Sequence, residues 1–192
     1  MKTPILETSR LWLKPLKEED APGAFLWTGD PKVSWYMRYE THESLEDTKQ
    51  WLREEEKQLD SDLLYDFGFH KKDSDELIGS GGLTFNQQQG IWELGCNLRR
   101  DCWNQGYGTE AAAAILSFAE NTLHIHRVMA RRAKENTASG RVLEKNGFSF
   151  VRECWDQKWS GSHRFECREY IWKSEKKEEK NSAARNEVER FY

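Results

Sequence analysis

The sequence predicts a single-domain α/β (α+β) protein, and three observations support that fold class. The chain has 192 residues, which suits one domain with a full hydrophobic core. Segments with strand and helix patterns follow one another in the order β-α-α-β-β-β-α-β-α-β-β, without an internal repeat. Residues 91–110 join an apolar strand, through a glycine turn, to an alanine-rich helix.

The first 60 residues of the chain predict one strand and two helices. Residues 10–16 alternate apolar and polar side chains and end after a proline, which predicts a first strand. Residues 17–27 open with acidic side chains and end before a Gly-Asp-Pro break, which predicts a helix. Residues 32–43 are aromatic and irregular. Residues 44–59 begin with the spacing of a capping box, Ser-Leu-Glu-Asp, and predict a second helix.

The second half alternates more regularly. Strands are expected at 64–69, 77–85, 91–98, 127–133, 148–153 and 164–173, and helices at 108–121 and 136–145. Gly79, Gly81 and Gly82 either weaken the second of these strands or mark a bulge where another chain or a ligand approaches. The domain is expected to cover residues 1–173, followed by a charged tail at 174–192 that is helical or disordered.

Composition excludes several classes of partner. The net charge is −4, and basic and acidic side chains alternate along most of the chain, so neither nucleic acid nor an anionic membrane is an expected partner. The longest apolar run is too short to span a bilayer, and the first ten residues lack a signal core, which predicts a cytoplasmic protein. The four cysteines show no ligand spacing, so we expect free thiols and no metal site.

Residues 91–110 have the features of an anion-binding turn. Arg99 and Arg100 end the apolar strand, and Gly106 and Gly108 precede the alanine-rich helix. The first N–H groups of a helix lack intrahelical partners and lie at its positive end, and glycines let a phosphate approach them. An ordinary strand-to-helix turn with glycines kept for geometry is the alternative interpretation.

The same glycines also spell a dinucleotide-binding fingerprint. Gly106-Tyr-Gly-Thr-Glu-Ala111 fits G-x-G-x-x-A, and Glu135 occupies the position of the acidic ribose ligand in a Rossmann fold. However, the motif comes after about half the chain and follows strands that look antiparallel. Too few residues remain after it for a doubly wound sheet, which argues against this interpretation.

Four stretches in order resemble the GNAT acetyltransferase superfamily, and its RimJ/RimL-type branch most closely, over roughly residues 8–173. They are Thr8-Ser-Arg-Leu-Trp-Leu-Lys-Pro-Leu16, Trp103-Asn-Gln-Gly-Tyr-Gly-Thr-Glu-Ala111, His126-Arg-Val128 and Asn136-Thr-Ala-Ser-Gly-Arg-Val-Leu-Glu-Lys-Asn-Gly-Phe148. The usual first residue of the family's Q/R-x-x-G-x-G/A motif is replaced by tryptophan here. The resemblance implies a mixed, mostly antiparallel sheet with central splayed parallel strands and flanking helices.

The resemblance also implies acetyl-CoA as acetyl donor. Backbone N–H groups of the glycine turn would hold its pyrophosphate, the splayed strand edge would pair with its pantetheine arm, and the loop before the second predicted late helix would contact it. The implied cofactor-binding residues are Cys96, Leu98, Arg99, Gln105, Gly106, Tyr107, Gly108, Thr109 and Asn136. A helix N-cap is a second role for Asn136, compatible with the first.

Acetyl transfer to an amine needs a base and a group for the departing thiolate. Glu93 is the candidate base, with a surface strand residue as the alternative interpretation. Many GNAT enzymes use a tyrosine as thiolate acid, but Glu144 occupies that position here. The resemblance to RimJ/RimL-type proteins gives this contact to Ser139, with helix stabilisation as the alternative and Tyr170 as a reserve acid.

Three functional hypotheses follow. The first is acetyl-CoA-dependent N-acetylation of a protein or peptide α-amine, whose pKa of about 8 requires only a modest base, whereas that of lysine is about 10.4. The second is the same chemistry on a small amine such as a polyamine, an amino acid or an antibiotic. The third is a non-catalytic CoA-binding regulatory domain. A homodimer is common in the family and is a further expectation.

Overall fold

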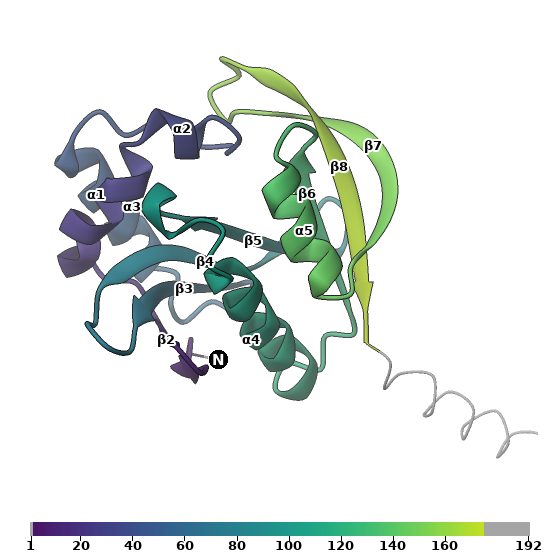
Figure 1. The fold of residues 1–192 in the computed structure, drawn as a ribbon, viewed down its shortest axis with the longest axis horizontal. Helices are drawn as coiled ribbons and strands as arrows, with labels where there is room; N and C mark the ends of the chain where they lie inside the picture. The colour runs from purple at the N-terminus through teal and green to yellow at the C-terminus, as the bar shows by residue number, and fades with distance from the viewer. Residues whose placement is uncertain (1, 175–192) are drawn as a thin grey trace, which may run out of the picture.

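The computed structural model describes residues 2–174, so the predicted tail falls almost entirely outside the described residues. Within that range the chain forms one eight-stranded sheet, five α-helices and two short 3-10 helices. The strand order is β1-β2-β3-β4-β5-β6-β8-β7, and every neighbouring pair is antiparallel except β5 and β6 (Figure 1). This mixed, mostly antiparallel α+β sheet confirms the predicted fold class.

The predicted elements are present, with small shifts at their ends. The strands are β1 Leu6–Glu7, β2 Leu11–Lys14, β3 Leu64–Lys71, β4 Leu77–Asn86, β5 Ile91–Leu98, β6 Arg127–Ala133, β7 Ser149–Gln157 and β8 Arg164–Lys173. The helices are α1 Ala21–Thr28, α2 Pro31–Ser34, α3 Leu45–Glu56, α4 Tyr107–Asn121 and α5 Thr137–Lys145, with 3-10 turns at Glu18–Asp20 and Arg100–Cys102. The sequence interpretation missed β1 and α2, because elements of two and four residues show no measurable periodicity.

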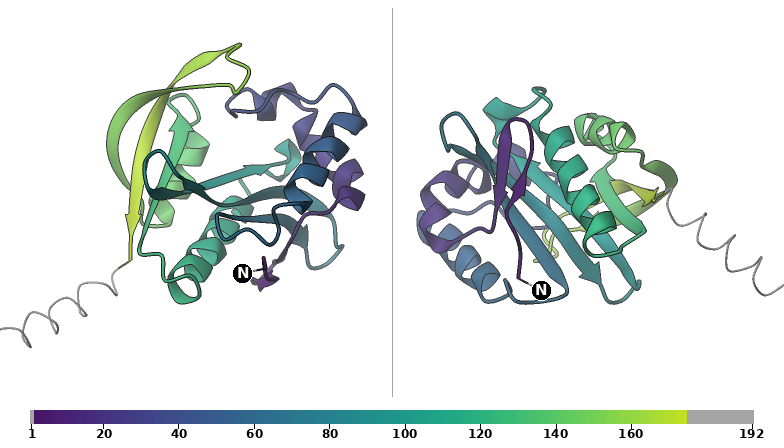
Figure 2. Two further views of the ribbon diagram at one scale, coloured as in Figure 1. Left: turned by 180° about the vertical axis from the view of Figure 1, so that it is seen from behind. Right: turned by 90° about the horizontal axis from the view of Figure 1, so that it is seen from below.

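Two apolar clusters hold the sheet between its helices. The larger lies between the sheet and α4, where fully buried Ala111 and Ala112 let the helix backbone lie close to the strands. The smaller joins α1 and α3 to the other face through Trp27 and Leu52. Figure 2 shows α1–α3 gathered at one end of the sheet and α4 running along it. None of the helices within residues 2–174 combines the length and apolarity needed to cross a bilayer.

The glycines of β4 allow close approach of neighbouring strands. A Cβ at Gly82 would overlap the Tyr65 carbonyl oxygen of β3, and one at Gly81 would overlap the Cys96 Cβ of β5. The strand stays continuous through both residues. The groups that approach these glycines belong to neighbouring strands of the same chain. The pairing with β3 shifts register between Phe69 and His70, where β4 has one extra residue, Ile78, next to Gly79, so a bulge lies beside the first of these glycines.

The central parallel pair separates almost at once. β5 and β6 pair only at Trp92 with Val128 and at Glu93 with Met129. After these positions the two strands diverge, while β5 stays paired with β4 and β6 with β8. The edge of β5 from residue 94 to 98 is therefore left without a strand partner on the β6 side, and this notch positions the site.

Candidate active site

The glycine turn forms a ready N-terminus for α4. Gly106 is the N-cap residue and has φ +84°, a left-handed conformation that glycine adopts without strain. The Glu110 N–H donates to the Gly106 carbonyl at 3.0 Å, which begins the helical ladder. The N–H groups just before Glu110 consequently have no partner within the helix, and they lie at its positive end.

Glu110 and Arg10 hold this turn against the start of the sheet. The Glu110 carboxylate accepts hydrogen bonds from Thr8 Oγ1 (2.7 Å), Ser9 Oγ (2.9 Å) and the backbone and side chain of Arg10 (2.8 and 2.7 Å). Burial alone would raise the pKa of Glu110, but these hydrogen bonds outweigh it and lower the pKa to about 2. Arg10 also donates to the Gln105 carbonyl and lies 4.3 Å from the centre of the Tyr107 ring.

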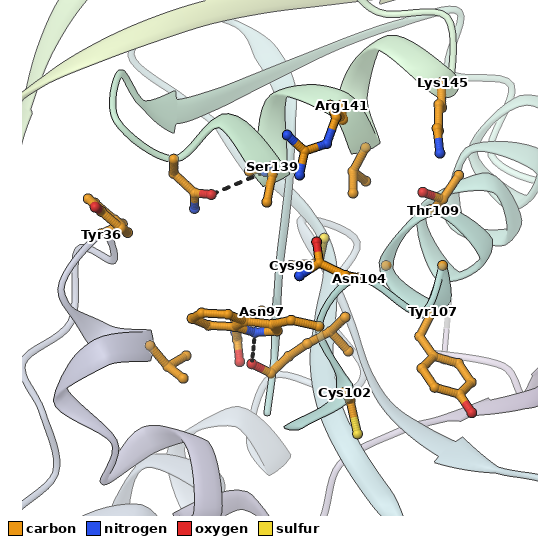
Figure 3. A pocket seen from close by; sticks show the side chains of 18 of the residues that line it. Tyr36, Cys96, Asn97, Cys102, Asn104, Tyr107, Thr109, Ser139, Arg141 and Lys145 are labelled. Carbon is orange, nitrogen blue, oxygen red and sulfur yellow. Dashed lines mark hydrogen bonds between the residues drawn. The ribbon is translucent and has the colours of Figure 1, made fainter. Parts of the chain in front are cut away.

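A cavity of about 330 Å³ lies in front of the α4 N-terminus, between β5 and α5 (Figure 3). Most of the predicted cofactor residues line it, together with the predicted Ser139: Cys96, Leu98, Gly106, Tyr107, Gly108, Thr109, Asn136 and Ser139. Tyr107 lies at the edge of the cavity, since its ring points away from the centre in Figure 3. Segments distant in sequence thus meet at one site.

Arg99 and Gln105 do not line this cavity. Arg99 is engaged by Glu76 and Asp101, at 2.7 and 2.6 Å, and Gln105 donates its side-chain amide to the Asp101 carbonyl at 2.7 Å. The basic residues that line the cavity are Lys32 of α2 and, from α5, Arg141 and Lys145. The sequence reasoning missed all three, although the spacing of four residues between Arg141 and Lys145 places these two on one helix face, one turn after the predicted Asn136.

The strand edge and the α5 N-terminus frame the inner end of the cavity. The Trp103 indole Nε1 donates to the Leu98 carbonyl at 2.8 Å, so the tryptophan that departs from the family motif closes over the last residue of β5. Asn136 caps α5 by accepting from the Ser139 N–H at 3.1 Å, as its alternative role predicted. The Ser139 hydroxyl makes no hydrogen bond to another described residue that would withhold it from the cavity.

A second cavity of about 670 Å³ lies on the side of α3 and the β7–β8 hairpin. It meets the first at the splayed strand, because Tyr36, Met37, Cys96 and Asn97 line both. Two further aromatic residues, Tyr39 and Trp51, line the second cavity alone. Its floor consists of the sheet face opposite α4, and its roof is formed by the loop after α2 and the hairpin.

Arg38 crosses this second cavity. Its guanidinium donates to Glu93 Oε1 of β5 at 2.9 Å and to Asp156 Oδ2 of β7 at 2.8 Å. Burial lowers the pKa of Arg38, but the two carboxylates outweigh it and the net shift is upward, so the arginine stays charged. Glu93 therefore lines the cavity as the partner of a permanent cation, rather than as an isolated carboxylate.

Tyr170 takes a structural position. It is 2% exposed, lines neither of the two cavities, and accepts a hydrogen bond from Arg132 Nη2 at 3.1 Å. Arg132 also donates to the Ala133 and Lys134 carbonyls, at 3.1 and 2.7 Å, just before the loop that carries Asn136. The reserve acid of the sequence analysis thus supports the α5 loop from beneath.

The comparisons agree with this geometry. A domain model described as the acetyltransferase (GNAT) domain matches residues 10–149. The uncharacterized N-acetyltransferase p20 of Bacillus licheniformis is 29% identical over 154 residues, covering 77% of this chain and 83% of the relative. The ribosomal protein uS5-alanine N-acetyltransferase of Escherichia coli is 32% identical over 85 residues, or 43% of each chain.

The fold comparison points the same way. The RimL ribosomal alpha-N-protein acetyltransferase, solved in complex with coenzyme A, superposes with a TM-score of 0.75 at 15% identity, covering 88% of this chain and 98% of that one. The chain belongs to the GNAT acetyltransferases and is an N-acetyltransferase. Its sequence and structural neighbours include members of the RimJ/RimL branch, and acetyl-CoA is the donor that the family uses.

Proposed function

We propose that the protein transfers the acetyl group of acetyl-CoA directly to the N-terminal α-amine of a protein or peptide. One observation supports this most strongly: two cavities on opposite sides of the splayed β5 edge share Cys96 and Asn97. Donor and acceptor can therefore approach each other from opposite sides at one strand. The names of the ribosomal-protein N-acetyltransferases among the neighbours support a protein N-terminus as acceptor.

The residues of the first cavity fit the acetyl donor. Acetyl-CoA supplies an acetyl group activated as a thioester. The unpartnered N–H groups at the start of α4 are donors for its pyrophosphate, and Arg141 and Lys145 add full positive charges beside them. The unpaired edge of β5 offers backbone groups to the amide-bearing arm. Gly108 lines the cavity between Leu98 and Val142, where it leaves the approach open.

Glu93 is the proposed proton acceptor, acting through a water on the amine. Its ion pair with Arg38 holds the carboxylate on the wall of the second cavity. An α-amine needs only a modest base, because roughly a tenth of such amines are already neutral at pH 7. A lysine side chain, with a pKa of about 10.4, would require a much stronger base.

Ser139 is proposed to donate a hydrogen bond to the departing thiolate. Its hydroxyl lines the donor cavity, and the capping bond to Asn136 fixes the first turn of α5 that carries it. A serine hydroxyl is a weak acid, so hydrogen bonding rather than complete proton transfer is the role its chemistry allows. A backbone N–H of the unpaired β5 edge is the proposed donor to the developing oxyanion.

The test is a thiol-release assay with acetyl-CoA and a panel of N-terminal peptides, polyamines and aminoglycosides. We expect peptides to be acetylated at the α-amine, with the product mass and fragmentation locating the acetyl group. Turnover only on polyamines or aminoglycosides would show that the acceptor is a small amine and not a protein or peptide N-terminus. Tight CoA binding without turnover on any acceptor would favour the regulatory-domain hypothesis.

A further inference from the structure

We propose that the carboxylates of Glu55 and Asp66 form a subsite for a second positive charge on the acceptor, separate from the amine that is acetylated. The inference rests on the proposed function, because it takes the second cavity as the acceptor site. Glu55 comes from α3 and Asp66 from β3, and both line the end of that cavity farther from β5.

An open path leads from the splayed strand to this pair. Asp66 of β3 is in register with Gly82 of β4, which is in register with Gly95 of β5. Two of the three residues in this row have no side chain, and a Cβ built on Gly95 meets nothing within 4 Å. Because neighbouring strands lie about 4.8 Å apart, the row measures roughly 10 Å from Gly95 to Asp66. An extended acceptor can lie along it.

The pair differs from the other acidic residues of the cavity in lacking a cation. Glu93 and Asp156 share Arg38, and Glu40 accepts from Ser160 and Ser162 and lies 3.9 Å from Lys158. Among residues 2–174, the Glu55 carboxylate accepts only from the Trp51 indole, at 3.2 Å, and Asp66 forms no ion pair. Two neighbouring half-buried carboxylates without a counter-ion are costly to keep ionised together.

The electrostatics agree with this count of partners. Burial, reinforced by the negative charge of Glu55, raises the pKa of Asp66 to about 8. Burial also raises the pKa of Glu55, although the Trp51 hydrogen bond opposes it. A cation bound between the two groups would remove this penalty, because an opposite charge favours the ionised form of each carboxylate.

Independent polar groups in the walls also lack protein partners. Trp27 is fully buried and lines the same cavity, and its Nε1 has no hydrogen-bond acceptor among residues 2–174. Thr3 is 5% exposed, its hydroxyl is equally unpartnered there, and it lines a small void of about 10 Å³ together with Glu55 and Asp66. Such groups are normally satisfied by ligand or water. The Thr3 oxygen can accept a hydrogen bond from an ammonium group held by the two carboxylates, whereas the Trp27 N–H only donates and needs an acceptor oxygen.

The acceptor chemistry that fits is a primary amine with a second cationic group roughly 8–10 Å away, the length of the row. Two sources have this chemistry: a lysine or arginine side chain close to a peptide N-terminus, and the distal ammonium of a linear polyamine. The shared feature is the separated pair of positive charges, so the two sources are compared in the experiment.

The test uses matched acceptors with wild-type protein and the variants Asp66→Asn and Glu55→Gln. One arm compares peptides with lysine or norleucine at the second and third positions, and the other compares linear diamines of increasing length with the matching monoamines. For wild type we expect kcat/KM to favour the charged acceptor by about 10- to 100-fold, mainly through KM. Each variant should lose most of this preference while changing kcat/KM for the uncharged acceptor less than about threefold.

Control variants and a binding measurement separate the possible failures. Glu54→Gln and Asp73→Asn make the same chemical changes at exposed positions on α3 and after β3, and should keep the preference. Equal preference in wild type and Asp66→Asn, or none in wild type, would overturn the subsite and leave the pair a structural role. If no acceptor turns over, the proposed function fails, and calorimetric titration of the diamine into CoA-bound protein decides the subsite: binding weakened by Asp66→Asn supports it, and unchanged or absent binding overturns it.

Discussion

The proposed donor cavity, in front of α4, and the proposed acceptor cavity, beside α3 and the β7–β8 hairpin, lie side by side but are lined by different kinds of groups. The first of these combines backbone groups at Gly106, Gly108 and the first turns of α4 and α5 with the cationic side chains of Arg141 and Lys145. The acceptor cavity is formed by side chains from six strands and the helical end of the sheet. A backbone site serves one unvarying ligand, whereas a side-chain site can change its ligand through single substitutions. We therefore expect the family's features in the first cavity and expect the choice of acceptor to depend on the second.

The largest expected effect is on the donor side. In Gly108→Asp a carboxylate enters the anion site, and we expect the Kd for CoA to rise at least about 100-fold because the new charge opposes the phosphates. Titration calorimetry with CoA measures it. Gly108→Ala is the control, since its Cβ would lie 3.4 Å from Leu98 Cδ1 and 3.7 Å from Val142 Cγ2, which are ordinary contacts. Normal CoA binding by Gly108→Asp would refute the phosphate site.

The next effect should appear on the acceptor side alone. A leucine in Gly95→Leu extends into open space over the acceptor floor, so KM for the acceptor should rise about 10- to 100-fold. The Kd for CoA should change less than about threefold, since Gly95 does not line the donor cavity. Steady-state kinetics and CoA titration test the two statements separately. Equal losses in both would show that the cavities are not independent.

Glu93 lies where β5 and β6 separate, and its substitution should change kcat without changing CoA binding. Glu93→Gln keeps the size of the side chain but removes the proton acceptor, so kcat should fall about 10- to 100-fold with little change in CoA affinity. A fall smaller than about tenfold would reject Glu93 as the base. Because glutamine also weakens the contact with Arg38, Asp156→Asn, which removes the other carboxylate of Arg38, serves as control and should retain most of kcat.

The smallest effect concerns stability and pH. Glu110→Gln removes charge-assisted hydrogen bonds to Thr8, Ser9 and Arg10 and should cost about 1–3 kcal/mol. The folded pKa of about 2 lies below the ordinary value of about 4.3, so the contribution is complete above that value and is lost as the pH falls toward 2. Thermal denaturation should show a Tm gap between wild type and variant that narrows from pH 6 to pH 3. A constant gap would contradict the assigned pKa.

The sequence was sufficient for much of the fold and of the donor cavity, because both depend on local signals. Glycines, caps and periodic apolar residues predicted β5, β6 and β8 with their observed bounds, and the turn at Gly106. Arg99 was predicted to bind the cofactor because it is close to the glycine turn in the sequence. In the structure it forms an ion pair with Glu76, which lies just before β4. That pairing is a tertiary contact, and no local pattern encodes it.

The acceptor side depends on contacts that only the folded chain creates. The ion pairs of Arg38 join residues 55 and 118 positions apart in the chain. The Glu55–Asp66 pair arises because the fold brings one residue of α3 and one of β3 to the same end of the second cavity, and neither residue stands out in the sequence. Arg141 and Lys145 are the exception: the predicted α5 helix already places them on one face, so helical spacing could have identified them.

The early separation of β5 and β6 also bears on aggregation. An unpaired strand edge at the rim of a sheet invites a strand from another molecule. Here the free edge is in the interior of the sheet, where α5 faces it and the Trp103 indole covers the Leu98 carbonyl. The edge of β5 thus stays available to a slender ligand, while α5 stands in the way of a strand from another molecule that would pair along it.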